Sequence, residues 1–586
     1  MLKLLKRMTK REYSMVCASF IFIVAQVWLD LKMPDYMSTI TTLVQTPGSE
    51  MSDILLNGGY MLLCAVGSMI AAMITGYLAA RVAAGLSKTV REKVFKKVMH
   101  FNSEEIGRFS TASLITRTTN DITQVQMIVA MGLQAIIKAP ILLVWAIIKI
   151  SGKQWQWSLA TAAAVLVILV VLMIAVVLAL PKFKIIQQLT DNLNRVTREN
   201  LTGIRVVRAY NAEKFQEDKF EKANEELTKT NLFSNRVMAL LMPTMSFVTS
   251  AISLAIYWIG AYIIDAADIM GRLTIFSDMV VFSSYAMQVI MAFTMLTMMF
   301  IMLPRVLVSA HRINEVLDTD ISLKDGSLEI PDTNVQGQIE FRNVSFKYPD
   351  AGDYVLENIS FTVEAGQTVA IIGSTGSGKS TLINLVPRFY DVTEGEVLVD
   401  GVNVKKYTQK ALRNKLGYVS QRAVLFSGSV KSNVMYGDNG KNQLPEDMAE
   451  AVSIAQAYDF VEKMDGQYDA CIAQGGTNVS GGQKQRLSIA RAICRRAEIY
   501  IFDDTFSALD YKTDRTLRIA LNSKLRAATK IIVAQRIGTI RNADKIIVLD
   551  SGKIAGMGTH DELMQTCKAY QEIARSQLSE EELKNA

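Results

Sequence analysis

The sequence contains little histidine and little cysteine. Three histidines, far apart along 586 residues, leave little room for a metal site built on imidazole. Five cysteines form an odd, scattered set without a CxxC pair, which excludes a disulfide scaffold and a zinc ribbon. The net charge of +7 is small for this length, so charge gives no indication of a nucleic-acid partner.

Charged residues are scarce in long stretches of the N-terminal half. Half of all residues are hydrophobic and 20% are charged, which is too apolar for a purely soluble chain and too charged for one lying wholly in lipid. A membrane-spanning helix needs about 20 mostly apolar residues. We therefore predict an all-α transmembrane domain over residues 1–315, with six spans at about 13–31, 54–80, 122–148, 154–181, 237–264 and 276–304.

Basic residues are distributed unevenly among the loops between these spans. Residues 81–121 carry eight Lys or Arg and residues 182–236 carry eleven, whereas residues 33–53 carry none. Loops rich in Lys and Arg stay in the cytoplasm. The sequence thus predicts a multi-pass protein of the cell membrane, with both termini and everything after the sixth span in the cytoplasm.

The membrane half offers two weaker pointers to function. The sixth span is rich in methionine, whose flexible thioethers suit a surface that accepts apolar ligands of varied shape. Packing against lipid and neighbouring helices is the more common role of such residues. Asp278 and Lys138 are ionisable at membrane depth, where such groups usually face an interior cavity; snorkelling at an interface is the alternative. The methionines of the sixth span are Met279, Met287, Met291, Met295, Met298, Met299 and Met302.

After residue 315 the pattern changes to that of a soluble domain. Residues 316–337 are polar and are interpreted as a linker, and residues 338–586 alternate β-branched runs with amphipathic helices, as in an α/β domain. A run of the form G-x-x-x-x-G-K-S lies between an apolar strand and a helix, the setting of a P-loop. Backbone N–H groups of such a loop surround phosphates, Lys379 neutralises their charge and Ser380 offers a hydroxyl to Mg²⁺. The run comprises Gly373, Ser374, Thr375, Gly376, Ser377, Gly378, Lys379, Ser380 and Thr381.

Two further motifs fit an ATP site. The apolar strand at residues 499–502 ends in Asp503, placed to hold Mg²⁺ through water, and Asp504, at the position of a base for the attacking water. Ser480 starts a helix as its N-cap, and the following glycines let a phosphate approach the helix N-terminus closely. Taken alone, the second motif could be just a capped helix; it continues with Gly481, Gly482 and Gln483.

Together these residues resemble the ATP-binding cassette (ABC) family over nearly the whole chain. Val479–Gln483 is similar to the family signature LSGGQ, and Ser507–Asp510 to the loop after the catalytic strand. Residues 106–117 and 199–210 look like the two cytoplasmic loops of ABC exporters, whose short helices dock on the ATPase domains. Six spans followed by one cassette is the half-transporter arrangement, so the resemblance implies that a second chain is needed to complete the transporter.

The resemblance also implies roles for two residues outside these motifs. Tyr348 lies where the family stacks an aromatic ring on adenine, and Gln421 matches the glutamine that meets both Mg²⁺ and the membrane domain. With Ser380 and Asp503, Gln421 would complete the protein's contribution to an Mg²⁺ site.

Two residues depart from the family pattern in one site. The family's catalytic Glu after Asp503 is replaced by Asp504, and its switch His is replaced by Gln535. A carboxylate drawn back by ~1.5 Å no longer aligns water, and misplacement on this scale can cost on the order of 10²-fold in rate. Glutamine can hydrogen-bond a γ-phosphate but cannot carry the proton that histidine can. Gln474, where many members have Glu, is a further departure.

These departures lead to a specific functional expectation. In the family, each nucleotide lies between the phosphate loop of one chain and the signature of the other. We therefore expect a slow or inactive ATP site on this chain, whose signature completes the site of a homologous partner that supplies Glu and His. The expected function is ATP-driven export of small amphipathic or apolar compounds from the cytoplasm or the membrane lipid, with multidrug efflux as the expected class. The alternatives are a lipid flippase, a peptide exporter, an importer, and an ATP-gated channel or regulatory subunit.

Overall fold

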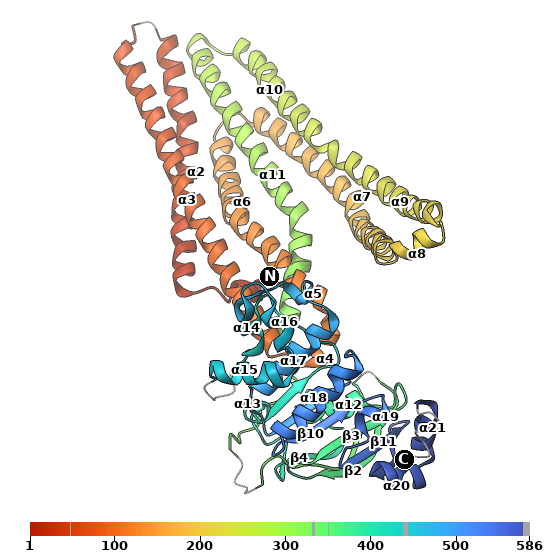
Figure 1. Cartoon of the computed structure of the whole chain (residues 1–586). Helices are drawn as coiled ribbons and strands as arrows, with labels where there is room; N and C mark the ends of the chain where they lie inside the picture. Colours follow the sequence, from red (N-terminus) through yellow and green to blue (C-terminus); the bar gives the residue numbers. More distant parts are fainter. Residues whose placement is uncertain (47, 331–334, 350, 438–442, 578–586) are drawn as a thin grey trace. The chain divides into compact units, whose positions relative to one another are not determined.

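The computed structural model describes residues 1–46, 48–330, 335–349, 351–437 and 443–577, and it divides into two compact units (Figure 1). The first unit comprises Met1–Met99 and Ser110–Thr319, and the second comprises His100–Phe109 and the chain from Asp320 onward. Residues 331–334 of the predicted linker lie outside the described residues, as do residues 350, 438–442 and 578–586 of the predicted soluble domain.

In its described residues, the first unit is built from helices joined by short loops. Its described residues contain six segments long and apolar enough to cross a membrane, which confirms the predicted six-helix class. Their apolar cores agree with the stretches that lack charge in the sequence. The helices are α1 (Leu2–Leu5), α2 (Lys10–Gln45), α3 (Met51–Met99), α5 (Thr111–Thr118), α6 (Asn120–Ser151), α7 (Trp155–Thr202), α8 (Ile204–Ala209), α9 (Glu213–Ala239), α10 (Leu241–Asp265) and α11 (Ile269–Asp318).

Helices α2, α3, α7 and α11 run well past the apolar stretches. Helix α2 continues to Gln45 because its outer turns bind α11: Tyr285 Oη donates to Asp35 Oδ1 (2.6 Å), and the hydroxyls of Ser38 and Ser277 lie 2.8 Å apart. Helix α11 remains unbroken to Asp318, into the start of the predicted linker. The part of α11 after residue 304 keeps the helical period, since Val306, Ala310, Ile313 and Val316 are all buried.

Charged side chains inside the membrane unit are paired with one another. Lys138 Nζ lies 3.1 Å from Asp30 Oδ2, and the two side chains are only 18% and 20% exposed. Lys149 Nζ lies 2.7 Å from Asp35 Oδ2, and Lys153 contacts Asp278. The ion pairs therefore join α2 to α6, and the loop after α6 to α11. Lys138 and Asp278, which the sequence marked as ionisable at membrane depth, have partners that offset the cost of placing a charge there.

The second unit is built on a six-stranded sheet of order β12-β11-β3-β10-β9-β6, parallel except for β12. An antiparallel sheet of order β2-β1-β4-β5 lies in the same unit, and β7 (Gly428–Ser429) pairs with β8 (Cys471–Ile472). The other strands are β1 (Ile339–Phe346), β2 (Leu356–Val363), β3 (Thr368–Gly373), β4 (Glu394–Val399), β5 (Val402–Asn403), β6 (Leu416–Val419), β9 (Ile499–Asp503), β10 (Thr529–Val533), β11 (Lys545–Asp550) and β12 (Lys553–Gly558).

Both faces of the parallel sheet are buried, as expected for central parallel strands. Along β9, Tyr500 and Phe502 belong to one apolar core, and Ile499 and Ile501 belong to the other. The strands of the antiparallel sheet supply part of the second core. The helices are α12 (Lys379–Asn384), α13 (Gln409–Asn414), α14 (Val430–Val434), α15 (Pro445–Ile454), α16 (Tyr458–Glu462), α17 (Gly481–Cys494), α18 (Tyr511–Lys524), α19 (Ile537–Ile540), α20 (His560–Thr566) and α21 (Lys568–Gln577). This α/β architecture after six membrane helices confirms the predicted fold class.

A short helix from the first basic loop belongs to the second unit. Helix α4 (Ser103–Phe109) and the residues just before it form hydrogen bonds with the first residues of the second unit after Asp320. Asn102 Nδ2 donates to Ser322 Oγ (2.6 Å), and Ser322 N donates to Glu105 Oε1 (2.9 Å). Residues 320–322 are thus ordered by side-chain contacts rather than acting as a free linker.

Candidate active site

The candidate site is set by the carboxyl ends of four parallel strands. In the sheet register, Val533 of β10 pairs with both Ile371 of β3 and Asp503 of β9, while Val419 of β6 pairs with Phe502. Parallel strands place their carboxyl ends at one edge of a sheet, where ligands bind in open α/β folds. The segments that leave this edge are the predicted phosphate loop, Asp503–Asp504, Gln535 and Gln421, so the fold brings separate motifs together.

The phosphate loop follows β3 and leads directly into α12. Gly376 (φ +85°) and Gly378 (φ +94°) take left-handed conformations that favour glycine. A Cβ on Gly378 would also lie 2.7 Å from Leu356 Cδ2, so the loop needs glycine there for space as well as for backbone geometry. Lys379 Nζ donates to the carbonyl oxygens of Gly373 (2.9 Å) and Ser374 (2.6 Å), and no side chain caps the N-terminus of α12.

Asp503 and Ser380 form the part of the site suited to a divalent cation. Ser380 Oγ donates to Asp503 Oδ1 (2.9 Å), and the Asp503 side chain is only 5% exposed. Burial, together with the nearby charge of Asp504, raises the pKa of Asp503 above its usual range; burial lowers the pKa of Lys379. Hydroxyl, carboxylate and amide oxygens are the donors that Mg²⁺ prefers, so Ser380, Asp503 and Gln421 fit the predicted ion.

Asp504 is turned sharply out of the strand and is held by two amides. Its φ is +43°, in the left-handed region that Asp tolerates better than most residues. Gln535 Nε2 donates to Asp504 Oδ2 at 2.8 Å, and Gln421 Nε2 donates to the same oxygen at 3.3 Å. The two residues that depart from the family pattern are therefore direct hydrogen-bond partners, with Asp504 only 8% exposed.

Most of the residues predicted for nucleotide binding line one open cavity of about 260 Å³. Tyr348 does not line it, but its hydroxyl lies 3.0 Å from Thr381 Oγ1 and its ring packs edge-on against Tyr390. Sequence reasoning missed two lining residues. Val533 could have been found as the end of the strand before Gln535, whereas no motif marks Val355. The lining comprises Val355, Thr375, Gly376, Gly378, Lys379, Ser380, Thr381, Gln421, Asp503, Asp504, Val533 and Gln535.

The predicted signature does not contribute to this cavity. Ser480 is the N-cap of α17: its Oγ accepts from Gln483 N (3.3 Å), and Gln483 Oε1 accepts from Ser480 N (2.9 Å). Gly481 and Gly482 form the first helical turn, and a Cβ on Gly482 would meet Ala508 O at 3.4 Å, an ordinary contact. The helix start is thus well capped, and its glycines are not required by crowding within this chain.

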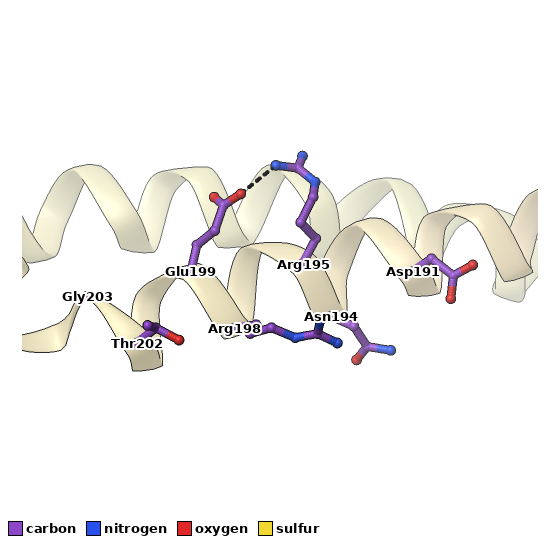
Figure 2. Close-up of a pocket in the computed structure, with 7 residues that line it drawn as sticks. All are labelled: Asp191, Asn194, Arg195, Arg198, Glu199, Thr202 and Gly203. Atoms are coloured by element: carbon purple, nitrogen blue, oxygen red, sulfur yellow. Dashed lines mark hydrogen bonds and ion pairs between the residues drawn. The ribbon is translucent and has the colours of Figure 1, made fainter. Parts of the chain in front are cut away.

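A separate hollow of about 700 Å³ lies in the membrane unit along the end of α7 (Figure 2). Figure 2 shows its side chains projecting from one helix, with an ion pair between Arg195 Nη1 and Glu199 Oε1 (2.8 Å). A surface supplied by one helix does not enclose a nucleotide, unlike the edge of the sheet. The lining residues are Asp191, Asn194, Arg195, Arg198, Glu199, Thr202 and Gly203.

Comparison with known proteins identifies the family. Residues 16–293 match the model of the ABC transporter transmembrane region, and residues 356–507 match the ABC transporter model. An uncharacterised ABC transporter ATP-binding protein of Mycobacterium tuberculosis is 41% identical over 522 residues, which cover 89% of this chain and 87% of that protein. The chain belongs to the ABC transporter family.

Other relatives place this ABC transporter among half-transporters with the exporter fold. An ATP-dependent lipid A-core flippase of Aromatoleum aromaticum is 32% identical over 507 residues, covering 86% of this chain and 82% of the flippase. A bacterial Atm1-family ABC exporter with ATP bound superimposes with a TM-score of 0.78 at 24% identity, covering 97% of this chain and 100% of the other. The predicted arrangement of one membrane domain followed by one ATPase domain is confirmed, and the cavity at the sheet edge belongs to the ABC ATP-binding domain.

Proposed function

We propose that this ABC exporter is the subunit with the degenerate ATP site in a heterodimer, and that its signature completes the competent site of its partner. The observation that carries the proposal is the hydrogen bond from Gln535 Nε2 to Asp504 Oδ2 at 2.8 Å. An amide N–H cannot accept a proton, and an acceptor oxygen already engaged by two amides is poorly placed to take one from water. Both departures from the family pattern thus affect the same carboxylate oxygen, and both lower the rate of ATP hydrolysis at this site.

Binding of ATP requires less of the site than hydrolysis does. Lys379 and the backbone N–H groups of the glycine loop are placed to neutralise and surround phosphates, which neither departure alters. When bound beside Ser380, Asp503 and Gln421, Mg²⁺ would neutralise charge on the β- and γ-phosphates. Gln535 offers an amide donor to the terminal phosphate. The proposed site therefore holds ATP and turns it over slowly.

The proposed substrates are small amphipathic or apolar compounds, with multidrug efflux as the first class. Met287, Met291 and Met298 are exposed on one face of α11, spaced so that their thioethers share that face. Lys138 and Asp278, the charged residues at membrane depth, form ion pairs within this chain. Because they are already paired, the proposed cargo is uncharged or weakly charged. A lipid is the second candidate, because relatives at 32% identity are named lipid A-core flippases. The proposed location is the cell membrane, with the ATPase domain and both termini in the cytoplasm.

Purification of the full chain without a partner tests the heterodimer. We expect it to bind ATP but to hydrolyse it far more slowly than the complex purified with its partner. A matched repair variant, Asp504→Glu with Gln535→His, should raise the activity of the lone chain by about tenfold or more, since its signature is intact. Robust ATPase activity of the unmodified lone chain, abolished by Lys379→Ala, would exclude the proposal.

A further inference from the structure

The last helix of the described chain touches the segment that carries Gln535. Helix α21 ends at Gln577, whose side-chain amide makes two hydrogen bonds to the backbone. Gln577 Nε2 donates to Gln535 O at 2.7 Å, and Gln577 Oε1 accepts from Ile537 N at 2.9 Å. One planar amide therefore brackets the backbone on both sides of Arg536.

The second of these bonds satisfies a group that helices usually leave unpaired. Ile537 is the first residue of α19, and the N-cap residue Arg536 provides no side-chain cap. The first N–H groups of a helix have no partner within the helix. Gln577, 40 residues further along the chain, supplies the missing acceptor. The first residue of α19 is therefore fixed by a side chain of α21.

Helix α21 is itself firmly anchored. Tyr570 and Ala574 are fully buried, and Tyr570 Oη lies 2.7 Å from Nδ1 of the buried His560. The Gln571 amide of the same helix donates to Met564 O (2.9 Å), and neither residue lines the nucleotide cavity. The amide of Gln577 thus extends from a packed helix and not from a loose tail.

The bracketed segment leads directly to the nucleotide cavity. Gln535 lines that cavity, and its own side chain donates to Asp504, one of the two carboxylates whose charges act on Lys379. We propose that Gln577 is a positioning residue for nucleotide recognition: it fixes the backbone of Gln535 so that the Gln535 amide faces the terminal phosphate. The inference rests on the role toward the terminal phosphate proposed above for Gln535, and it does not require the heterodimer.

The test compares the affinities of the purified full chain for ATP and for ADP, each with Mg²⁺, by competition against a fluorescent nucleotide. Gln577→Ala should raise the Kd for ATP by about three- to tenfold, the range for a loosened hydrogen bond, and leave the Kd for ADP within about twofold. A purely structural role would weaken both nucleotides alike. Gln577→Glu, which keeps the acceptor but cannot donate to Gln535 O, should behave like Gln577→Ala.

Two controls make the outcome decisive. Gln571→Ala removes the same kind of amide from the same helix and should leave both Kd values unchanged. In a Gln535→Ala background, Gln577→Ala should have no further effect on ATP, because the positioned side chain is gone. The proposal is overturned if Gln577→Ala leaves the ATP affinity unchanged, if it weakens ATP and ADP equally, or if the effects of the two substitutions simply add.

Discussion

Asp504→Asn tests whether the phosphate-loop site of this chain performs a demanding step in hydrolysis. The substitution keeps the side-chain size and removes the charge. Asp504 Oδ2 accepts hydrogen bonds from Gln535 (2.8 Å) and Gln421 (3.3 Å), so two charge-assisted bonds become neutral ones, a loss of about 1 kcal/mol each. The change loosens the site locally. Under the proposed function turnover occurs at the partner's catalytic residues, and the complex should keep at least about half of its steady-state ATPase rate.

Gly482→Asp should have the opposite result at the other site. A Cβ on Gly482 meets Ala508 O at 3.4 Å and Leu509 Cδ2 at 4.0 Å, so the variant fits within this chain and should fold. Its carboxylate, however, would face the phosphates that the partner's loop brings to the start of α17. Two like charges about 4 Å apart repel by roughly 4 kcal/mol at the effective dielectric of a protein surface. That penalty lowers the rate on the order of 10³-fold.

The assay is the steady-state ATPase rate of the co-purified complex in lipid vesicles, with substrate transport measured in parallel. Gly482→Ala is the matched control, because it adds the Cβ without the charge and should reduce the rate only slightly. If Asp504→Asn proves as damaging as Gly482→Asp, then Asp504 is a working base and the asymmetric two-site mechanism is wrong.

Two further predictions concern the membrane unit. In a cysteine-free background, a single cysteine at Ser49 should react with a membrane-impermeant thiol reagent on intact cells and one at Thr111 should not; reversed labelling would contradict the proposed orientation. Lys138→Met should destabilise the membrane unit by about 1–3 kcal/mol, because it leaves the partly buried carboxylate of Asp30 without its cation. Adding Asp30→Asn should recover most of that loss in thermal unfolding, and a double variant no more stable than Lys138→Met would show that the ion pair is not the cause.

The residues that gather at the edge of the sheet could be predicted from the sequence, because short motifs encode them locally. A strand, a glycine run and a helix in succession place Lys379 and Ser380 at the start of the helix, and this placement does not depend on contacts with distant parts of the chain. Asp503 likewise follows an apolar strand, and parallel pairing brings its end beside the phosphate loop. The hydrogen bond between Gln535 and Asp504 was not predicted, because it depends on the left-handed turn at Asp504, which no residue pattern marks.

The membrane unit shows the complementary limit of sequence reasoning. Gaps between charged residues locate the six spans, since the bilayer imposes length and polarity on every span alike. The same rule marks Lys138 as unusual but cannot name Asp30 as its partner, 108 residues away, because helix rotation and packing decide which faces meet. Residues 33–53 are predicted as a loop for the same reason: the helical state of residues 33–45 depends on contacts with α11 that only the packed structure provides.

The two departures from the family pattern are best understood as one change. With the shorter side chain of Asp504, its carboxylate lies within 2.8 Å of the Gln535 amide. The amide N–H donates at any physiological pH, whereas a histidine at the same position would alternate between donor and acceptor as it titrates. The pair therefore keeps a fixed hydrogen-bond pattern beside Lys379 and gives up proton transfer. Under the proposed function, such a site holds an ATP through the transport cycle while the partner's site hydrolyses, and the signature glycines of this chain serve the partner's site.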